Sequence, residues 1–142
     1  MSVKTFPMPD FSEFTTTKLA SRPIETAPDG SALRALLGVA GGTMAHFEIA
    51  AGETSRAVAH RTVDEIWFVV SGSGELWLQQ ASRQEVVALE PGVCAALPRG
   101  TRFQFRASEA EAVAIVAVTI PRWPGDFEAE LVDGPWSPSE QA

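Results

Sequence analysis

The sequence has few cysteines and few basic residues, the types that would indicate an oxidising compartment or a negatively charged partner. It contains one cysteine, Cys94, and only 11 lysines and arginines against 18 acidic residues. A single cysteine cannot form a disulfide within the chain, which favours a reducing, cytoplasmic setting. The net charge of −7 argues against nucleic acid and anionic membranes as partners, because both are bound through a basic face.

Long apolar segments are also missing. The longest apolar run, residues 112–118, is seven residues long, whereas a membrane-spanning helix needs ~20. The first seven residues hold one lysine and no long apolar core, so we expect no signal peptide. With 142 residues, 45% hydrophobic and 20% charged, the composition is that of a globular protein of one domain.

Helical periodicity is lacking as well. The segment nearest to a helix pattern, residues 33–37, lies between two turn sequences and is interpreted as a strand. Residues 43–50 alternate apolar and polar positions, with the period of a half-buried strand. Further short segments of this kind, separated by turn residues, lie at 58–61, 65–70, 75–79, 85–89, 93–97, 102–106 and 113–119. Successive short strands without helices predict an all-β antiparallel sandwich or barrel.

The two ends of the chain differ in composition from this central part. Residues 1–32 are predicted to form an N-terminal arm with the first short strands, and residues 121–142 a tail rich in proline and tryptophan. We expect the tail to pack on the barrel of residues 33–120, and the arm to lie on the body or on a neighbouring subunit. The aromatic residues behind this expectation are Phe6, Phe11 and Phe14 in the arm, and Trp123, Phe127 and Trp136 in the tail.

Two motifs in the central part carry a resemblance to a known family. The pattern G-x5-H-x-H-x3,4-E-x6-G is matched in its intervals by Gly52, His60, Glu65 and Gly72. The pattern G-x5-P-x-G-x2-H-x3-N is matched in its intervals by Gly92, Pro98 and Gly100. With 19 residues between the motifs, the chain resembles a small single-domain member of the cupin superfamily. The resemblance implies a jelly-roll barrel, or double-stranded β-helix, and a homodimer, which the apolar arms also favour.

The resemblance further implies a divalent metal held by three histidines and one glutamate. This chain keeps His60 and Glu65, while Val58 and Phe103 stand at the other two ligand positions. Two protein ligands are too few for a firm zinc or octahedral site. No cofactor is therefore certain, and a divalent metal bound by His60 and Glu65 stays an alternative.

Strand alternation predicts the walls of a pocket between the two motifs. It places Arg56, Val58, His60 and Thr62 on one face of the first-motif strand. On the second-motif strand it sets Thr101, Phe103 and Phe105 inside, and Arg102, Gln104 and Arg106 outside. The expected pocket is an apolar cup lined by Val58, Trp67, Phe103 and Phe105, with Arg56, His60, Thr62 and Glu65 as its polar end. This composition is typical of a small-molecule site.

Within this pocket His60 and Glu65 are the candidate catalytic pair. Imidazole titrates near neutral pH, and a carboxylate can orient it for general acid–base catalysis. The alternative is that both residues are relics of a lost metal site, hydrogen-bonded to each other. An inward-pointing Arg56 would suit a carboxylate, phosphate or enolate, so the leading hypothesis is a small-molecule protein, enzymatic on an organic acid or a similar compound.

Two other hypotheses remain open on the sequence alone. One is a metal-dependent cupin enzyme (an oxygenase, isomerase or lyase) with a depleted ligand set, and the other is a non-catalytic ligand sensor. His46 alternates with the apolar residues of its strand and is predicted at the surface or an interface. Cys94 is interpreted as a small buried hydrophobe, with a nucleophile facing the pocket as its alternative.

Overall fold

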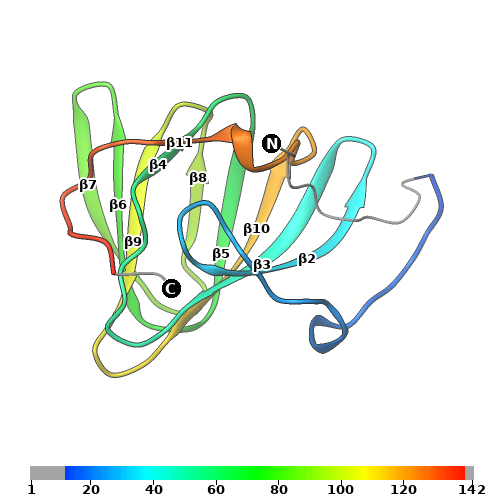
Figure 1. Cartoon of the computed structure of the whole chain (residues 1–142), viewed down its shortest axis with the longest axis horizontal. Coiled ribbons are helices and arrows are strands. Elements are labelled where there is room, and N and C mark those ends of the chain that lie inside the picture. The colour runs from blue at the N-terminus through cyan, green and yellow to red at the C-terminus, as the bar shows by residue number, and fades with distance from the viewer. Residues whose placement is uncertain (1–11, 140–142) are drawn as a thin grey trace.

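The computed structural model of the chain describes residues 12–139, and the strands of this part form two antiparallel sheets that face each other (Figure 1). Sheet A has the order β1 (Glu25–Thr26), β2 (Ala32–Val39), β3 (Gly42–Ile49), β10 (Val113–Ile120), β5 (Asp64–Gly72) and β8 (Cys94–Leu97). Sheet B has the order β11 (Ala129–Leu131), β4 (Val58–His60), β9 (Arg102–Ala107), β6 (Gly74–Gln80) and β7 (Arg83–Leu89). Two 3-10 turns, η1 (Leu19–Ser21) and η2 (Asp126–Glu128), are the helical elements of the described residues.

This architecture confirms the all-β jelly roll predicted from the sequence. Each segment predicted from period-two alternation contains or overlaps one of the strands β3 to β10, and residues 33–37 lie within β2. β1, which is two residues long, lies within residues 1–32, where the first short strands were expected without bounds. The sequence did not predict β11, which is three residues long. None of the described helices is long or apolar enough to span a bilayer.

Alternation along β5 shows how the pattern builds the core. Trp67 and Val69 are buried between the sheets, while Ile66, Phe68 and Val70 between and beside them are about half exposed on the outer face of sheet A. The buried side chains join those of β6, β9 and β10 in one apolar cluster. Full burial of a large apolar side chain contributes about 1.5–3 kcal/mol, so this cluster is the main source of stability for the barrel.

The glycines of both motifs adopt backbone conformations that other residues avoid. Gly52, Gly72, Gly92 and Gly100 all have positive φ, between 76° and 94°. At Gly72 a β-carbon would in addition collide with the carbonyl oxygen of Ala112 on the neighbouring chain segment. The motif spacing that marks the family is therefore a requirement of the turns at the strand ends.

The C-terminal segment crosses the outer face of sheet B, as the orange-to-red part of Figure 1 shows. Gln104 on β9 is completely buried there: its side-chain nitrogen donates to the carbonyl oxygen of Trp136, and its side-chain oxygen accepts from the Trp136 backbone N–H. The Arg106 guanidinium lies 4.0 Å from the centre of the Trp136 ring. The face of β9 that was expected to meet solvent is thus covered by the tail.

The N-terminal segment is attached to β2 by two arginine hydrogen bonds. The Arg22 side chain donates to the carbonyl oxygen of Ala35 at 2.7 Å, and Arg34 donates to that of Leu19 at 3.3 Å. Phe14 is fully exposed, so it does not pack on the body of its own chain, and the other expectation, that the arm lies on a neighbouring subunit, stays a prediction. Phe6 and Phe11 lie outside the described residues, as do the last three residues of the tail.

Candidate functional site

A narrow pocket opens between the two sheets at one end of the barrel. Its volume is about 40 Å³, which gives space for roughly three water molecules. Most of its lining is apolar, and its polar side chains come from Asp29, Thr43, His60, Glu65 and Thr119. Val58, Trp67 and Phe103, which the sequence placed in the apolar wall, are part of the lining. The pocket is thus an apolar cup with a few polar groups.

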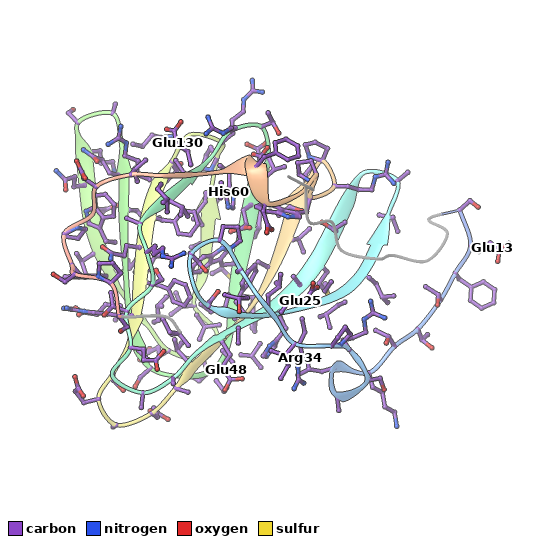
Figure 2. All side chains as sticks on the ribbon, in the orientation of Figure 1. Glu13, Glu25, Arg34, Glu48, His60 and Glu130 are labelled. Atoms are coloured by element: carbon purple, nitrogen blue, oxygen red, sulfur yellow. The ribbon has the colours of Figure 1, made fainter. Side chains whose placement is uncertain are left out.

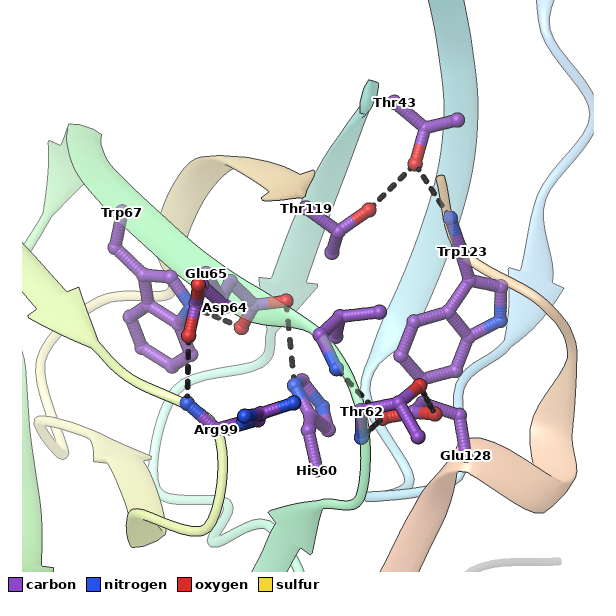
Figure 3. Close-up of polar contacts among 11 residues, drawn as sticks. Thr43, His60, Thr62, Asp64, Glu65, Trp67, Arg99, Thr119, Trp123 and Glu128 are labelled. Atoms are coloured by element: carbon purple, nitrogen blue, oxygen red, sulfur yellow. Dashed lines mark hydrogen bonds and ion pairs between the residues drawn. The ribbon is translucent and has the colours of Figure 1, made fainter. Parts of the chain in front are cut away.

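His60 and Glu65 meet in this pocket from opposite sheets. His60 is the last residue of β4 in sheet B, and Glu65 is the second residue of β5 in sheet A. Both are buried, and the Nδ1 atom of His60 lies 3.9 Å from the Oε2 atom of Glu65 (Figure 3). This distance is longer than a hydrogen bond, so the two side chains are close but not joined directly to each other.

Aromatic rings hold both side chains in place. The indole N–H of Trp67 donates to the Oε1 atom of Glu65 at 2.5 Å. The His60 ring makes edge contacts with Phe103 and Trp123, at centroid distances of 5.3 and 5.1 Å. Trp67 in turn packs edge-on against Phe103 at 5.5 Å. Each functional side chain therefore has a defined orientation before any ligand binds.

Burial moves both groups toward their neutral forms. Desolvation raises the pKa of Glu65 from 4.5 to about 8; the Trp67 hydrogen bond opposes this shift, and the nearby Asp29 carboxyl supports it. Desolvation lowers the pKa of His60 from 6.5 to about 4, against the opposing effect of Glu128. At neutral pH the pocket thus holds a protonated carboxylic acid beside a neutral imidazole.

Glu128 is a functional candidate that the sequence did not reveal. It lies in η2, is completely buried, and accepts hydrogen bonds from the backbone N–H and hydroxyl of Thr62, both at 2.5 Å, and from the N–H of Val63 at 3.0 Å (Figure 3). Burial alone would raise the pKa of Glu128, but these hydrogen bonds and the nearby His60 lower it. Glu128 holds the turn that directly follows His60.

Asp29 is a second residue that sequence reasoning missed. It is buried in the lining of the pocket, and its Oδ1 atom accepts hydrogen bonds from the backbone N–H and the hydroxyl of Ser31, at 3.0 and 2.6 Å. Burial raises the pKa of Asp29, and the Ser31 bonds oppose that shift. Its only sequence signal was the Asp-Gly pair, which indicated a turn and nothing about a site.

Two threonines and the tail close the end of the pocket. The hydroxyl groups of Thr43 on β3 and Thr119 on β10 lie 2.5 Å apart in a hydrogen bond. The backbone N–H of Trp123 donates to the Thr43 hydroxyl at 3.1 Å (Figure 3). The segment that follows β10 is thereby attached at the rim, where the Trp123 ring contacts His60.

Three of the residues predicted for the pocket lie elsewhere. Arg56 is exposed, with its guanidinium directed at the carbonyl oxygen of Pro28 at 3.4 Å, and Thr62 is exposed and bound to Glu128. Phe105 is completely buried, but it packs against Trp67 inside the core and does not line the pocket. Alternation failed for Arg56 and Thr62 because β4 consists only of residues 58–60.

His46 and Cys94 both lie outside the pocket. His46 is half-buried on the outward face of β3, where it pairs with Val116 and Arg34 on the neighbouring strands. Cys94 is exposed at the start of β8. The structure therefore contradicts both interpretations of Cys94, as a buried hydrophobe and as a nucleophile in the pocket.

The residues at the family's metal position do not fit a metal ion. Among residues 12–139 there is no group of three or more histidine, cysteine, aspartate or glutamate side chains placed to hold one. At the two replaced ligand positions, Val58 and Phe103 present hydrocarbon to the pocket. One oxygen of Glu65 is bound by the Trp67 indole. A tetrahedral or octahedral metal needs more donors than His60 and Glu65 supply.

Comparison with known proteins places these features in a family. A family model described as "Cupin domain" matches residues 45–119, which include both motifs and all of the strands from β4 to β9. No curated protein matches the chain. The matched segment is more than half of the chain.

Solved structures share the fold at low sequence identity. KdgF from Halomonas sp. is 18% identical with a TM-score of 0.68, covering 79% of this chain and 97% of its own. The polyketide cyclase RemF from Streptomyces resistomycificus is 19% identical with a TM-score of 0.67, covering 87% and 88%. Pac13 from Streptomyces, described as a nucleoside dehydratase, is 16% identical with a TM-score of 0.65, covering 84% and 91%. At these identities the likeness concerns the fold.

Proposed function

This chain belongs to the cupin family, and we propose that it is a small-molecule enzyme that transfers protons, with Glu65 as general acid and His60 as general base. One observation carries the proposal: a buried carboxylic acid lies 3.9 Å from a buried imidazole at the polar end of an apolar pocket. General acid–base catalysis needs one group that holds a proton and one that accepts a proton at the working pH. The shifted pKa values of Glu65 and His60 supply both.

The proposed step begins with a neutral substrate whose oxygen lies against Glu65. Glu65 donates its proton to a hydroxyl or carbonyl oxygen, and His60 removes a proton from a neighbouring carbon of the same substrate. Loss of the protonated hydroxyl as water gives a dehydration, and protonation of a carbonyl gives an enol. The pair is left as carboxylate and imidazolium, whose opposite charges stabilise each other in a buried site. Return of the proton from His60 to Glu65 restores the starting state.

The comparisons agree with this class of reaction without assigning a substrate. Two of the similar structures are described as a nucleoside dehydratase and a polyketide cyclase. The metal-dependent alternative has less support, because Val58 and Phe103 replace two ligands. A fold alone does not determine the reaction, so the proposal depends on the His60–Glu65 geometry.

Hydrogen–deuterium exchange at carbon tests the proposal without knowledge of the final product. A panel of small ketones, aldehydes and hydroxy compounds is incubated with the protein in D₂O, and deuterium incorporation next to the oxygen-bearing carbon is followed by NMR. We expect exchange that His60→Ala and Glu65→Gln both abolish, while Cys94→Ser, a substitution at an exposed residue outside the pocket lining, leaves it unchanged. Exchange that persists in both variants would contradict the proposal. Binding without any exchange would favour the ligand-sensor hypothesis instead.

We also propose that the protein is a homodimer, as the resemblance implied. The outward side chains Ile66 and Phe68 of β5 lie beside Val118 and Val116 of β10, so the middle of sheet A presents an apolar outer face. Exposed apolar patches of this kind mark interaction surfaces. In a two-fold symmetric contact such a face meets its own copy, which matches apolar with apolar groups.

A further inference from the structure

The ionisable side chains that line the pocket, among residues 12–139, are acids and one imidazole. Of the described residues that line it, Asp29 and Glu65 carry carboxyl groups and His60 carries the imidazole, and none is a lysine or an arginine. The expected cation, Arg56, is exposed and not part of the lining: its guanidinium lies on the carbonyl oxygen of Pro28, and its charge acts on the pocket through Asp29 alone among the described lining residues. An organic acid was the expected ligand because of Arg56, and the structure removes that reason.

We infer that the pocket selects small, uncharged compounds that carry a carbonyl, amide or hydroxyl oxygen, and that it rejects carboxylates and phosphates of the same size. This inference names the substrate class of the proposed function and rests on that function for the choice of site. It replaces the organic-acid hypothesis, because the Arg56 side chain, on which that hypothesis rested, is exposed.

The cost of burying charge supports the exclusion of anions. A carboxylate that leaves water for an apolar pocket loses its hydration, and this loss is repaid only by a paired charge or by several hydrogen bonds. Here the charged partner is absent from the described lining, and two buried carboxyl groups, Asp29 and Glu65, would stand beside the anion. Whatever their protonation, two carboxyl groups favour an anion less than one guanidinium does.

An uncharged oxygen, in contrast, finds suitable partners in the same place. The hydroxyls of Thr43 and Thr119 lie in the lining, hydrogen-bonded to each other, and a hydroxyl can both donate and accept. The Oε2 atom of Glu65 faces His60 at 3.9 Å and is the oxygen that Trp67 does not bind. A carbonyl or hydroxyl oxygen of a ligand can therefore be satisfied without a net charge.

The size of the pocket limits the rest of the ligand. A volume of about 40 Å³ holds roughly three waters, so the part that enters is a short chain. The walls beside the polar end are the hydrocarbon side chains of Val58, Phe103 and Ala117. Small branched or linear compounds fit this description better than long or charged ones.

Matched pairs of amides and carboxylates test the inference, since each pair differs in charge at nearly constant shape. Acetamide and acetate, propionamide and propionate, and isobutyramide and isobutyrate are titrated at neutral pH into ¹⁵N-labelled protein. The indole N–H signal of Trp67, identified by its loss in Trp67→Phe, reports binding because this group contacts Glu65 in the pocket. We expect at least one amide to bind saturably and about ten-fold or more tightly than its carboxylate.

Two results would overturn the inference: a carboxylate that binds as tightly as its amide, or no amide that shifts the Trp67 signal up to its solubility limit. Glu65→Gln and Asp29→Asn each keep the shape of the pocket and add no positive charge, so in both variants the amide should still bind more tightly than its carboxylate. Arg83→Ala, which removes an exposed cation outside the lining, should leave the preference unchanged, and melting curves confirm that the variants fold. The titration needs no turnover, so absence of carbon exchange would refute the proposed reaction and leave this inference standing.

Discussion

The Nδ1 atom of His60 and the Oε2 atom of Glu65 lie 3.9 Å apart across the gap between the two sheets. The two residues lie on successive strands that belong to different sheets. β4 ends at His60, the chain turns at Thr62, and β5 begins at Asp64. Figure 2 shows His60 at the end of the barrel where η2 lies, away from Glu13 in the N-terminal arm. Because both sheets bury this pair, the pKa of Glu65 is raised and that of His60 is lowered. Both shifts have effects that can be measured.

The first prediction concerns stability against pH. Glu65 keeps its proton in the folded state up to a pH of about 8 but loses it near 4.5 when unfolded. The folded state therefore binds more protons in this range, and stability falls as pH rises. The pKa of His60 is about 4 in the folded state and 6.5 in the unfolded state, so between these values His60 makes stability rise with pH. The effects of the two residues therefore cancel between about pH 4.5 and 6.5. From pH 6.5 to 8 we expect a loss of about 2 kcal/mol, from ~1.4 kcal/mol per pH unit, measured by urea unfolding.

Other groups modify this profile in known directions. Burial raises the pKa of Asp29, which adds to the loss of stability with rising pH, and it lowers the pKa of His46, which acts in the opposite sense. The variant Glu65→Gln isolates the main effect, because the amide does not titrate. A decline between pH 6.5 and 8 as steep in Glu65→Gln as in the unchanged protein would show that Glu65 is not its source.

The second prediction concerns Glu128. Removal of its carboxylate in Glu128→Ala leaves the backbone N–H groups of Thr62 and Val63 without their partner. The Val63 group is buried, and we expect its lost hydrogen bond to reduce stability by about 1–3 kcal/mol; the Thr62 group belongs to an exposed residue and can bind water instead. The turn after His60 loosens at the same time, so carbon exchange should fall. Glu130→Ala is the matched control, two residues further on: its ion pair with Arg61 is half exposed and contributes at most about 1 kcal/mol. Equal losses in both variants would contradict a special role for Glu128.

The third prediction separates the chemistry of Trp67 from its packing. The Trp67 indole stabilises the carboxylate form of Glu65 by a hydrogen bond, so its loss in Trp67→Phe should raise the pKa of Glu65 further. The activity that depends on protonated Glu65 should then persist to higher pH, which a pH profile of carbon exchange records. Trp77→Phe is the control, because that indole donates to Gln84, which does not line the pocket. If carbon exchange is lost at the same high pH in Trp67→Phe and Trp77→Phe, the proposed effect of Trp67 on the pKa of Glu65 is refuted.

The fourth prediction concerns metal. Elemental analysis of protein purified without chelator or affinity tag should find far less than one divalent ion per chain, because His60 and Glu65 are too few ligands. The double substitution Val58→His with Phe103→His restores the ligand types of the family motifs and should raise the metal content. One ion per chain that disappears in His60→Ala would support the metal-dependent hypothesis instead.

The fifth prediction concerns assembly. Phe68 is about half exposed in the middle of the outer face of sheet A, so Phe68→Glu places a charge at the centre of the proposed contact and should yield monomers. Light scattering after size exclusion measures the mass. Val86→Glu, an equally exposed position on β7 of the other sheet, should leave the dimer intact. A monomer in the unchanged protein at micromolar concentration would rule out the dimer.

The sequence predicted much of the fold because its signals are local. Period-two alternation marks a strand from a few consecutive residues, as in β3 and β5, and the motif glycines mark turns whose backbone requires positive φ. Where local structure was interrupted, the same reasoning failed. Arg56 and Thr62 were assigned to the pocket by extending alternation beyond β4, which consists only of residues 58–60.

The sequence by itself determined the two-sheet barrel and the presence of His60, Glu65 and an apolar wall in one pocket. Only the tertiary structure decided that Asp29 and Trp123 line this pocket and that Glu128 holds the turn after His60, since these residues come from segments at opposite ends of the chain with no local pattern. It also decided the state of the pair. Glu65 and His60 become acid and base because their surroundings remove water from both, and burial is a property of the folded chain that spacing along the sequence does not contain.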